Sequence, residues 1–464
     1  MANSANATSR LGAFVARAVG TELSPAIASK AAICLLDALG LAIVARDENT
    51  AAAARAMTTP VDNGPGTARL WADGARAVVS EAVLANGVAV HAHFQDDTEH
   101  DSWSHPGSLI SPVAISLGEA TNASLRTVLE ALVAGYATMK WLGAGETVSR
   151  GLIGRGIRTS PTFGTIGAAA AAAVCLGLDA AQATNAVAIA ACTTGGTLEP
   201  VRCGSDEWRV QNGRAAHGGL VAAQLAAKSV QGAPDALEGP KGLLKSLAGL
   251  AESPAHWQND PDPATMIDIM AKPFATLGDN MSAVVAARLV HGDNIDLSKV
   301  KSITVAIWRP YTEYPGTSFK GPFERIVQTQ ASTAFATAAM LAYGELGYEM
   351  GVERRQDPRI LALIAKTTVV PDDVGNHLDA SIEIEMNDGT RHRRTARESP
   401  RTLIFQDEPR ATDVFEERVS RAGFSTGFGR ALAAEVFASA AGEGHLPIRT
   451  VIDRLTGIDK GNKK

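Results

Sequence analysis

Residues 90–107, which read VHAHFQDDTEHDSWSHPG, concentrate side chains that could do chemistry. The segment holds four of the chain's ten histidines, together with three aspartates and a glutamate. Imidazoles and carboxylates at this density could bind a metal ion, move protons, or form a solvated polar loop between two helices. Periodicity alone does not choose among these three alternatives.

A metal site would start from His91 and His93, with further ligands from Asp96, Asp97, His100 and His105. These residue types suit zinc or iron. However, residues two apart on a helix point in different directions, and the sequence has no second ligand cluster. The spacing therefore does not favour a metal site. A metallohydrolase built on His91 and His93 remains an alternative.

Proton transfer would centre on His105, whose backbone is constrained by Pro106 and Gly107. A histidine beside carboxylates can titrate near neutral pH, and Asp96 or Asp97 could fix its tautomer. Removing a proton from the carbon next to a carboxylate needs such a base. It also needs cations or hydrogen-bond donors that stabilise the enediolate.

Composition narrows the class of protein. The chain has 464 residues, 45% of them hydrophobic and 20% charged, and a net charge of −6. It is long enough for two domains. No long basic run is present, so we expect no nucleic acid and no acidic membrane surface as a partner.

The compartment is predicted from cysteines and apolar segments. The four cysteines form no Cys-x-x-Cys pair, which favours buried free thiols in a reducing cytoplasm. Residues 1–10 lack the basic start and apolar run of a signal peptide. Residues 31–45 are apolar but contain Asp37, so we expect a buried helix there. We predict a soluble, cytoplasmic protein.

The element pattern changes along the chain. Residues 10–265 show helical spacing with many alanines, which favours closely packed helices. Residues 299–308 alternate as a strand, and residues 381–396 alternate around Asn387-Asp388-Gly389 as a hairpin. Helices are expected between them at 333–346 and 357–367, and a helical pattern returns at 415–440.

The predicted fold class is therefore mainly α with a smaller α+β domain. We expect residues 1–268 and 400–464 to form a large all-helical domain from both chain ends. Residues 269–399 are expected to form the inserted α+β domain. A cleft between two such domains is a usual place for a substrate.

An ordered set of motifs resembles the MmgE/PrpD family. The run NGVAVHAHFQDDTEHDSWSHPGSLISPVAISLGEA (86–120) is similar to its signature of Asn-Gly, Ala-His, an acidic run and His-Pro. Four further segments match in order: LLDALGLAI (35–43), GRGIRTSPTFGTIGAAAAAAVCLGLD (154–179), GRAAHGGLVAAQLAAKSVQG (213–232) and KPFATLGDNMSAVVAA (from residue 272).

The resemblance implies an enzyme that acts on a small carboxylate, since the family includes dehydratases, decarboxylases and epimerases. It also implies a homodimer, no metal or cofactor, and a site between the two domains. His105 would be the proton-transfer residue. Asp97 and Thr98 match the end of the family's acidic run, as does Asp96. Lys272 would face a substrate carboxylate.

Several positions depart from the family pattern. Phe94 replaces an aspartate, Arg158 replaces a histidine, and Trp208-Arg209 occupy a segment that usually carries a lysine and a histidine. Near residue 280 the usual Asn-His reads Asn280-Met281. Arginine is no base at neutral pH, but its planar fork binds carboxylates. We therefore expect Arg158 and Arg209 to bind substrate carboxylates.

The remaining substrate contacts are expected from Asp96, His91 and Phe94, and Phe94 could accept an apolar part of the substrate. The sequence thus predicts a 2-methylcitrate dehydratase-like hydro-lyase with altered specificity. In this hypothesis His105 is the base or acid, Asp97 orients it, and Thr98 donates to the substrate. The alternatives are an epimerase or decarboxylase of the same family, or a member that binds ligand without catalysis.

Overall fold

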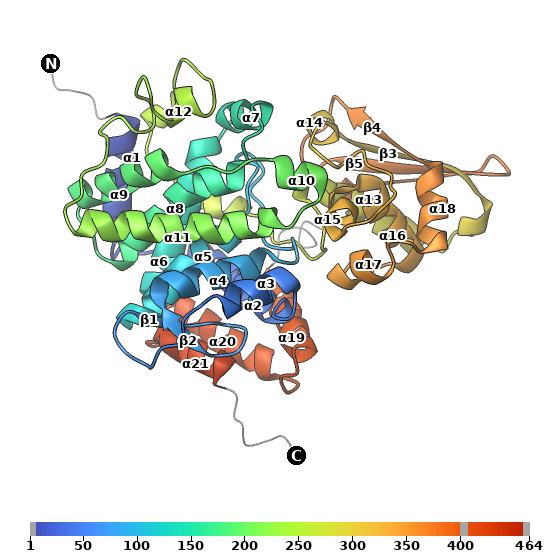
Figure 1. Cartoon of the computed structure of the whole chain (residues 1–464). Helices are drawn as coiled ribbons and strands as arrows, with labels where there is room; N and C mark the ends of the chain where they lie inside the picture. The colour runs from blue at the N-terminus through green and yellow to red at the C-terminus, as the bar shows by residue number, and fades with distance from the viewer. Residues whose placement is uncertain (1–5, 400–406, 458–464) are drawn as a thin grey trace.

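The computed structural model describes residues 6–399 and 407–457. The chain folds into a larger helical part and a smaller part with a four-stranded sheet (Figure 1). Helices account for 58% of the residues and strands for 9%, so the predicted fold class is confirmed.

Both ends of the chain contribute to the larger part. Its elements before the small part are α1 (Ala7–Ala18), α2 (Pro25–Val44), α3 (Asn49–Ala56), β1 (Thr67–Arg69), β2 (Arg76–Val78), α4 (Val79–His91), α5 (Gly107–Thr121), α6 (Leu125–Gly143), α7 (Thr147–Gly154), α8 (Thr159–Cys175), α9 (Ala180–Thr193), α10 (Glu199–Cys203), α11 (Glu207–Ala227) and α12 (Leu243–Ser246). Helices α19 (Glu408–Arg421), α20 (Phe428–Ala440) and α21 (Ile448–Thr456) complete it. The expectation that this part is all-helical was wrong, because β1 and β2 form a short antiparallel pair.

Helix α8 is central in the larger part, where it packs against α5, α6, α9 and α11. Its small residues allow close crossings. A Cβ on Gly167 would lie 2.9 Å from the carbonyl oxygen of Gly135 in α6, and a Cβ on Gly219 in α11 would lie 2.5 Å from the carbonyl oxygen of Thr165. A larger side chain at either glycine would push two helices apart.

Helix α2 is long and apolar enough to cross a membrane, but 89% of its most apolar window is buried inside the protein. Asp37 in this helix pairs with Arg418 of α19, with 2.7 Å between Oδ1 and Nη1. Removing either partner would leave a buried charge unpaired, so this contact ties the two chain ends together. The expected buried helix at 31–45 is thus observed.

The smaller part surrounds a sheet with the strand order β4-β3-β5-β6. Strand β3 pairs in parallel with β4 and antiparallel with β5, and β5 forms the predicted hairpin with β6. Inward residues alternate along β5, whose buried face packs on α13. Its elements are α13 (Met281–Gly292), β3 (Val300–Trp308), α14 (Arg309–Thr312), α15 (Ile326–Ala331), α16 (Thr333–Tyr343), α17 (Tyr348–Glu353), α18 (Pro358–Lys366), β4 (Thr367–Asp372), β5 (Ala380–Met386) and β6 (Arg391–Thr395).

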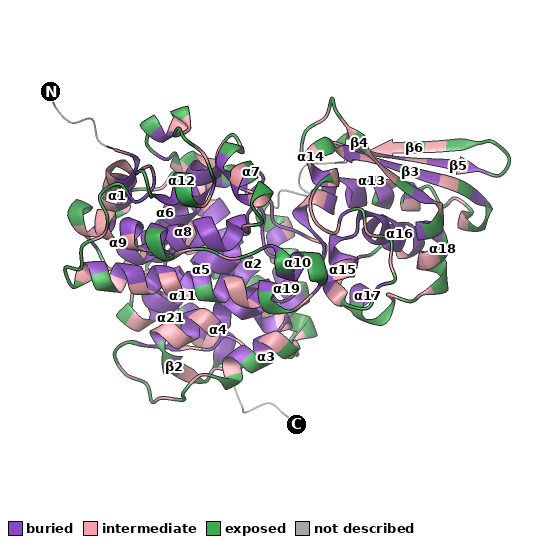
Figure 2. Ribbon diagram, turned by 45° about the horizontal axis from the view of Figure 1, so that its top comes forward, coloured by how far each residue is buried: buried purple, intermediate pink, exposed green. Residues whose placement is uncertain are grey.

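The described residues contain three apolar clusters: one core in each part, and a small third cluster at the junction that includes Phe94 and Trp208 of the larger part and Leu277 of the smaller part. The larger core draws on residues between 7 and 269 and again between 415 and 455, whereas the second draws on residues between 270 and 396. Figure 2 shows buried residues filling the inside of both parts. Residues 400–406 and 458–464, which our predicted boundaries assign to the large domain, lie outside the described residues.

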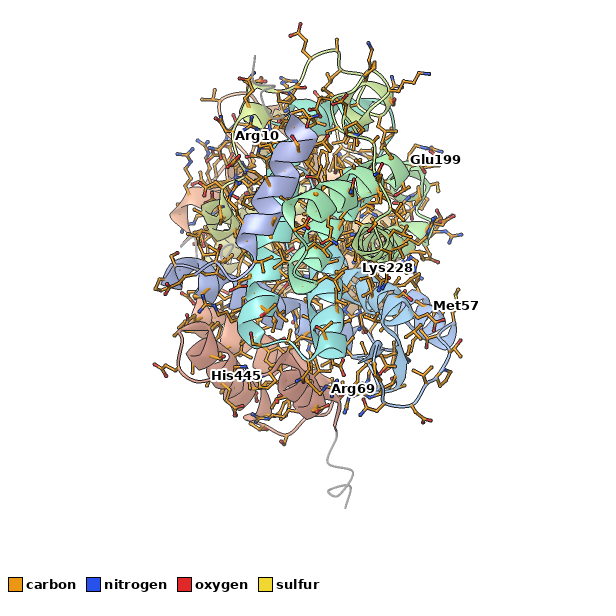
Figure 3. All side chains as sticks on the ribbon, turned by 90° about the vertical axis from the view of Figure 1, so that its left-hand side faces the viewer. Arg10, Met57, Arg69, Glu199, Lys228 and His445 are labelled. Carbon is orange, nitrogen blue, oxygen red and sulfur yellow. The ribbon has the colours of Figure 1, made fainter. Side chains whose placement is uncertain are left out.

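The exposure of the cysteines differs from what the sequence predicted. Cys192 and Cys203 are exposed, as are Met57 and Lys228 at the end of the larger part that faces the viewer in Figure 3. Cys34 is buried and Cys175 is half-buried. The expectation that all four thiols are buried was wrong, because Cys192 lies in the last turn of α9 and Cys203 ends the short helix α10.

Candidate active site

The loop between α4 and α5, residues 92–106, carries most of the predicted site residues. It is not a solvated loop, because nearly all its polar side chains are buried. Phe94 and Trp103 adopt left-handed backbone conformations, with φ of 55° and 52°. Backbone hydrogen bonds between Thr98 and Met270 attach the loop to the segment that enters the smaller part.

His105 is held in one orientation and, we infer, in one tautomer. Its Nδ1 lies 3.1 Å from the carbonyl oxygen of Asp97 and 3.2 Å from Oγ1 of Thr98. A carbonyl oxygen only accepts, so Nδ1 carries the hydrogen and Nε2 of the neutral ring carries a lone pair. Nε2 has no hydrogen-bond partner among the described residues. Burial, and then the charge of Lys272, hold the pKa of His105 well below its usual value. The ring is therefore a free base at neutral pH.

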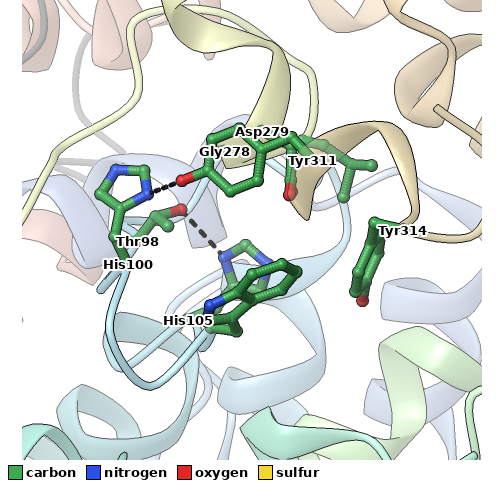
Figure 4. A pocket seen from close by; sticks show the side chains of 9 residues that line it. Thr98, His100, His105, Gly278, Asp279, Tyr311 and Tyr314 are labelled. Carbon is green, nitrogen blue, oxygen red and sulfur yellow. Dashed lines mark hydrogen bonds between the residues drawn. The ribbon is translucent and has the colours of Figure 1, made fainter. Parts of the chain in front are cut away.

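A cavity of about 20 Å³ adjoins His105, which is room for about one water molecule. Both parts of the molecule contribute to its wall (Figure 4). From the larger part come Thr98, His100, Trp103 and His105, and from the smaller part come Leu277, Gly278, Asp279, Tyr311 and Tyr314. The cavity therefore lies where the two parts meet.

Three titratable lining residues, Asp279, Tyr311 and Tyr314, were not predicted from the sequence. Asp279 lies in the 3-10 helix η3 (Gly278–Asn280), and the two tyrosines follow β3. The hydroxyl of Tyr311 is hydrogen-bonded to Nδ1 of His100. Oδ1 of Asp279 is buried and has no hydrogen-bond partner among the described residues. The clustered polar residues right after a strand, in WRPYTEY, were the available signal for the tyrosines.

Beside the cavity, Asp96, His91 and Arg158 form a buried chain of hydrogen bonds. Nδ1 of His91 lies 2.8 Å from Oδ2 of Asp96, and Nε2 lies 2.7 Å from Nη2 of Arg158. A guanidinium only donates, so Nε2 accepts and Nδ1–H donates to Asp96. Burial lowers the pKa of His91 to about 4, which keeps this ring neutral. Burial raises the pKa of Asp96, but His91 and His105 outweigh it and hold that pKa below its usual value.

Arg158 is committed to internal partners. Its Nη1 donates to the carbonyl oxygen of Trp208 at 2.6 Å and to Oε1 of Gln211 at 3.2 Å. It does not line the cavity that the described residues enclose. In this structure Arg158 therefore fixes His91 rather than presenting a free fork to a ligand.

Lys272 is fully buried behind the same wall. Its Nζ donates to the carbonyl oxygens of Phe94 at 2.8 Å and of Thr276 at 3.2 Å. Burial lowers the pKa of Lys272 to about 8, against the opposing effect of Asp96. An ammonium has three donors, so one N–H remains for a further acceptor.

Arg209 and Phe94 contact other protein groups and do not line the cavity. Arg209 donates to the carbonyl oxygen of Ala92 at 2.9 Å and pairs with Asp206 at 2.7 Å, away from the cavity lining. The Phe94 ring packs against Trp208, with 4.5 Å between ring centroids, and lies 5.2 Å from the His105 ring. Phe94 thus supports His105 from behind.

The carboxylate of Asp97 faces away from His105. Its Oδ1 accepts from the backbone N–H of Gly107 at 2.7 Å, and its Oδ2 accepts from the hydroxyl of Tyr136 at 2.6 Å. Burial, together with the charge of Asp37, raises the pKa of Asp97 to about 7. Asp97 therefore orients His105 through its backbone carbonyl, whereas its side chain anchors the start of α5.

The proposed metal ligands do not converge. The His93 ring stacks on Tyr348, with 3.8 Å between centroids, while His91 is bonded to Asp96 and Arg158. Among residues 6–399 and 407–457, no group of three His, Cys, Asp or Glu side chains could hold a metal ion together.

Comparison with known proteins gives the family. The model of the MmgE/PrpD N-terminal domain matches residues 9–255, and that of the MmgE/PrpD C-terminal domain matches residues 278–409. The chain belongs to the MmgE/PrpD family. The resemblance seen in the sequence is thereby confirmed. Residues 256–277 lie between the two matches, and in this segment the chain crosses from the larger part to the smaller part beside the cavity.

Two curated MmgE/PrpD relatives are named for decarboxylation. The chain is 28% identical over 339 residues to the cis-aconitate decarboxylase-like protein oryM of Aspergillus oryzae, a match that covers 66% of this chain and 69% of the fungal protein. It is 31% identical over 160 residues to human cis-aconitate decarboxylase, which covers 34% of this chain and 33% of the human protein. These relatives support a lyase-type role at the level of the family.

Proposed function

We propose that this protein is a cofactor-independent lyase that removes a proton from the carbon next to a carboxylate of a small di- or tricarboxylate. The observation that carries this proposal is the unpartnered Nε2 of His105, a neutral base at the cavity wall with its Nδ1–H held by Asp97 and Thr98. Hydro-lyase chemistry is our first choice of outcome.

The chemical step follows from these contacts. His105 Nε2 takes the α-hydrogen as a proton, and the C–H electron pair becomes the enediolate. The imidazolium that forms keeps its Nδ1–H bond to the Asp97 carbonyl oxygen. Thr98 Oγ1 can accept from His105 and still donate its own hydrogen to the substrate. The Lys272 ammonium lies behind this wall rather than in the cavity lining, and its positive charge would stabilise the enediolate through the field it creates.

Substrate binding requires motion at the junction. A cavity of about 20 Å³ is too small for a dicarboxylate. Its wall is shared by two parts that each have a core of their own and that meet through a small apolar cluster around Phe94. A shift of one part relative to the other at this cluster would enlarge the cavity. Arg158 and Arg209 would bind substrate carboxylates, as the sequence analysis expected, only if this motion freed them from their present partners.

Decarboxylation is the second candidate, because both relatives are named as cis-aconitate decarboxylases or decarboxylase-like. The proposal also includes a homodimer, a cytoplasmic location, and neither nucleic acid nor membrane as a partner. Light scattering on the purified chain would test the dimer.

The test uses the full chain with citrate, 2-methylcitrate, malate and cis-aconitate in deuterated water, followed by NMR. We expect at least one compound to exchange its α-hydrogen or to be converted, and His105→Gln to slow this by roughly 100-fold or more. An alkene with loss of water indicates a hydro-lyase, release of carbon dioxide a decarboxylase, and exchange with inversion an epimerase. A compound that binds but is never exchanged or converted would contradict the proposal and favour a binding protein.

A further inference from the structure

Asp279 is the acidic side chain that the smaller part contributes to the cavity wall. Asp279 is the second residue of the short helix η3, which begins directly after Leu277. In Figure 4, Asp279 and His105 lie on opposite sides of the space that the lining residues enclose. The two groups thus approach one small volume from different parts of the molecule.

One oxygen of the Asp279 carboxyl, the buried Oδ1, has no hydrogen-bond partner among the described residues. By contrast, both oxygens of the buried Asp97 carboxylate accept hydrogen bonds. Oδ1 of Asp96 also has no partner among the described residues, but Asp96 does not line the cavity. A buried polar atom without a partner is costly unless a ligand or water satisfies it. Oδ1 of Asp279 is therefore available to a molecule in the cavity.

The surroundings favour the protonated form of this carboxyl. Burial raises the pKa of Asp279 to about 7, and a hydrogen bond from its own backbone N–H, followed by the nearby charge of Lys272, opposes this rise. The other titratable groups that share the cavity are His100, His105, Tyr311 and Tyr314. Burial lowers the pKa of both histidines, so neither adds a positive charge at neutral pH.

The two tyrosines are poorer proton donors than Asp279. Burial raises the pKa of Tyr314 to about 12 and that of Tyr311 well above its usual value. The hydroxyl of Tyr311 is also occupied by His100. An acid works best when its pKa lies near the working pH, which favours the carboxyl.

We propose that Asp279 is the general acid of this site and protonates the hydroxyl oxygen that leaves the substrate after His105 has removed the α-hydrogen. This inference rests on the proposed hydro-lyase function and deepens it, because the substrate must carry a hydroxyl group β to its carboxylate.

The proton balance closes without a co-reactant. His105 Nε2 takes the α-hydrogen as a proton, and the C–H pair is held in the enediolate. In the next step the enediolate returns this pair to form the new C=C bond. The C–O pair leaves with the hydroxyl oxygen, which accepts the proton of Asp279 and departs as water. Imidazolium and carboxylate remain, and proton exchange with solvent restores both groups.

The test measures α-hydrogen exchange and water elimination separately, with citrate, 2-methylcitrate, malate and cis-aconitate in deuterated water. Asp279→Asn retains the shape of the side chain but carries no transferable acid proton, and Asp279→Ala provides a second variant if the first folds poorly. We expect both variants to keep α-hydrogen exchange within a few-fold of wild type and to lose roughly 100-fold or more in water elimination. His105→Gln should lose both activities. Asp268→Asn, at an exposed aspartate in the 3-10 helix η2 (Pro263–Asp268), is the matched control and should behave as wild type.

The pH profile gives a second readout. Elimination by the wild type should decline as the pH rises through about 7, because Asp279 loses its proton, and the asparagine variant should lack this decline. Wild-type elimination rates in Asp279→Asn would overturn the acid role while leaving the proposed function intact. If the wild type neither exchanges nor converts any compound, the proposed function and the acid role both fail.

Discussion

At the scale of single residues, hydrogen-bond direction determines what each group can do. Both His91 and His105 have their tautomers fixed by neighbours that can only donate or only accept. For His105 this leaves Nε2 bare, whereas for His91 both nitrogens are occupied. The two histidines thus have different roles. His105 is a base at the cavity wall, whereas His91 links Arg158 to Asp96 by hydrogen bonds.

Replacing Arg158 by methionine tests this chain of hydrogen bonds. Nε2 of His91 and the carbonyl oxygen of Trp208 would lose their donor while remaining buried. We expect a loss of about 3 kcal/mol in the free energy of unfolding, measured by chemical denaturation. Arg202→Met removes an exposed ion pair with Glu199 and should leave the denaturation midpoint unchanged. A stability equal to wild type in Arg158→Met would show that Arg158 is not needed for this wall.

At the scale of elements, α4, α5 and the loop between them place His105. Helix α5 begins at Gly107, where the carboxylate of Asp97 accepts the backbone N–H. The backbone carbonyl oxygen of Asp97 accepts a hydrogen bond from Nδ1 of His105. The start of the helix and the orientation of the base are therefore fixed by one residue, so a disturbance at Gly107 reaches the site.

Gly107→Ala should disturb this arrangement. A Cβ there would lie 2.9 Å from Oδ1 and 3.1 Å from Cγ of Asp97, which cannot move without losing its bond to the Gly107 N–H. We expect about 1–3 kcal/mol of destabilisation and slower α-hydrogen exchange. Gly154→Ala, at a helical glycine with no atom within 4 Å of its Cβ position, is the control and should not lose stability. Normal exchange in Gly107→Ala would argue against the shared role of Asp97.

Sequence patterns predicted some helices and strands correctly and missed others. Alternation identified β3 and the hairpin of β5 and β6, because one face of each strand is buried. Strand β4 (Thr367–Asp372) was missed, since it follows α18 without a turn signal and contains Pro371. The region at 415–440 was expected to be helical, but Gly427, with φ of 86°, separates α19 from α20.

At the scale of the whole molecule, the site depends on contacts that no local pattern encodes. His105 and Thr98 were predictable because they share one short segment. Asp279 and the two tyrosines reach the cavity only through the packing of the smaller part on the loop. Residue type also could not show that Arg158 and Arg209 donate to backbone carbonyls, since the same guanidinium geometry suits a carboxylate ligand.

His93 lies where three distant segments meet, and this makes the junction sensitive to acid. Its ring stacks on Tyr348 of α17, and its carbonyl oxygen accepts from Nε2 of Gln330 in α15. Burial, followed by Arg209 and by Arg418 and Arg421 of α19, lowers the pKa of His93 to about 3. An unfolded histidine titrates near 6.5, so below this pH the unfolded state binds a proton that the folded state refuses. The contribution of His93 to stability is therefore present above pH 6.5 and is lost as the pH falls towards 3.

His93→Gln should remove this dependence. Between pH 7.5 and 5.5, the wild type should lose about 1 kcal/mol more of its free energy of unfolding than His93→Gln does. Buried acids such as Asp97 shift stability in the opposite direction, but they are common to both proteins and cancel in the difference. The exposed His445 supplies the control, because His445→Gln should follow the wild-type pH dependence (Figure 3). Chemical denaturation at several pH values measures all three proteins. Identical pH dependence in the wild type and His93→Gln would mean that His93 takes up its proton as readily in the folded junction as in the unfolded chain.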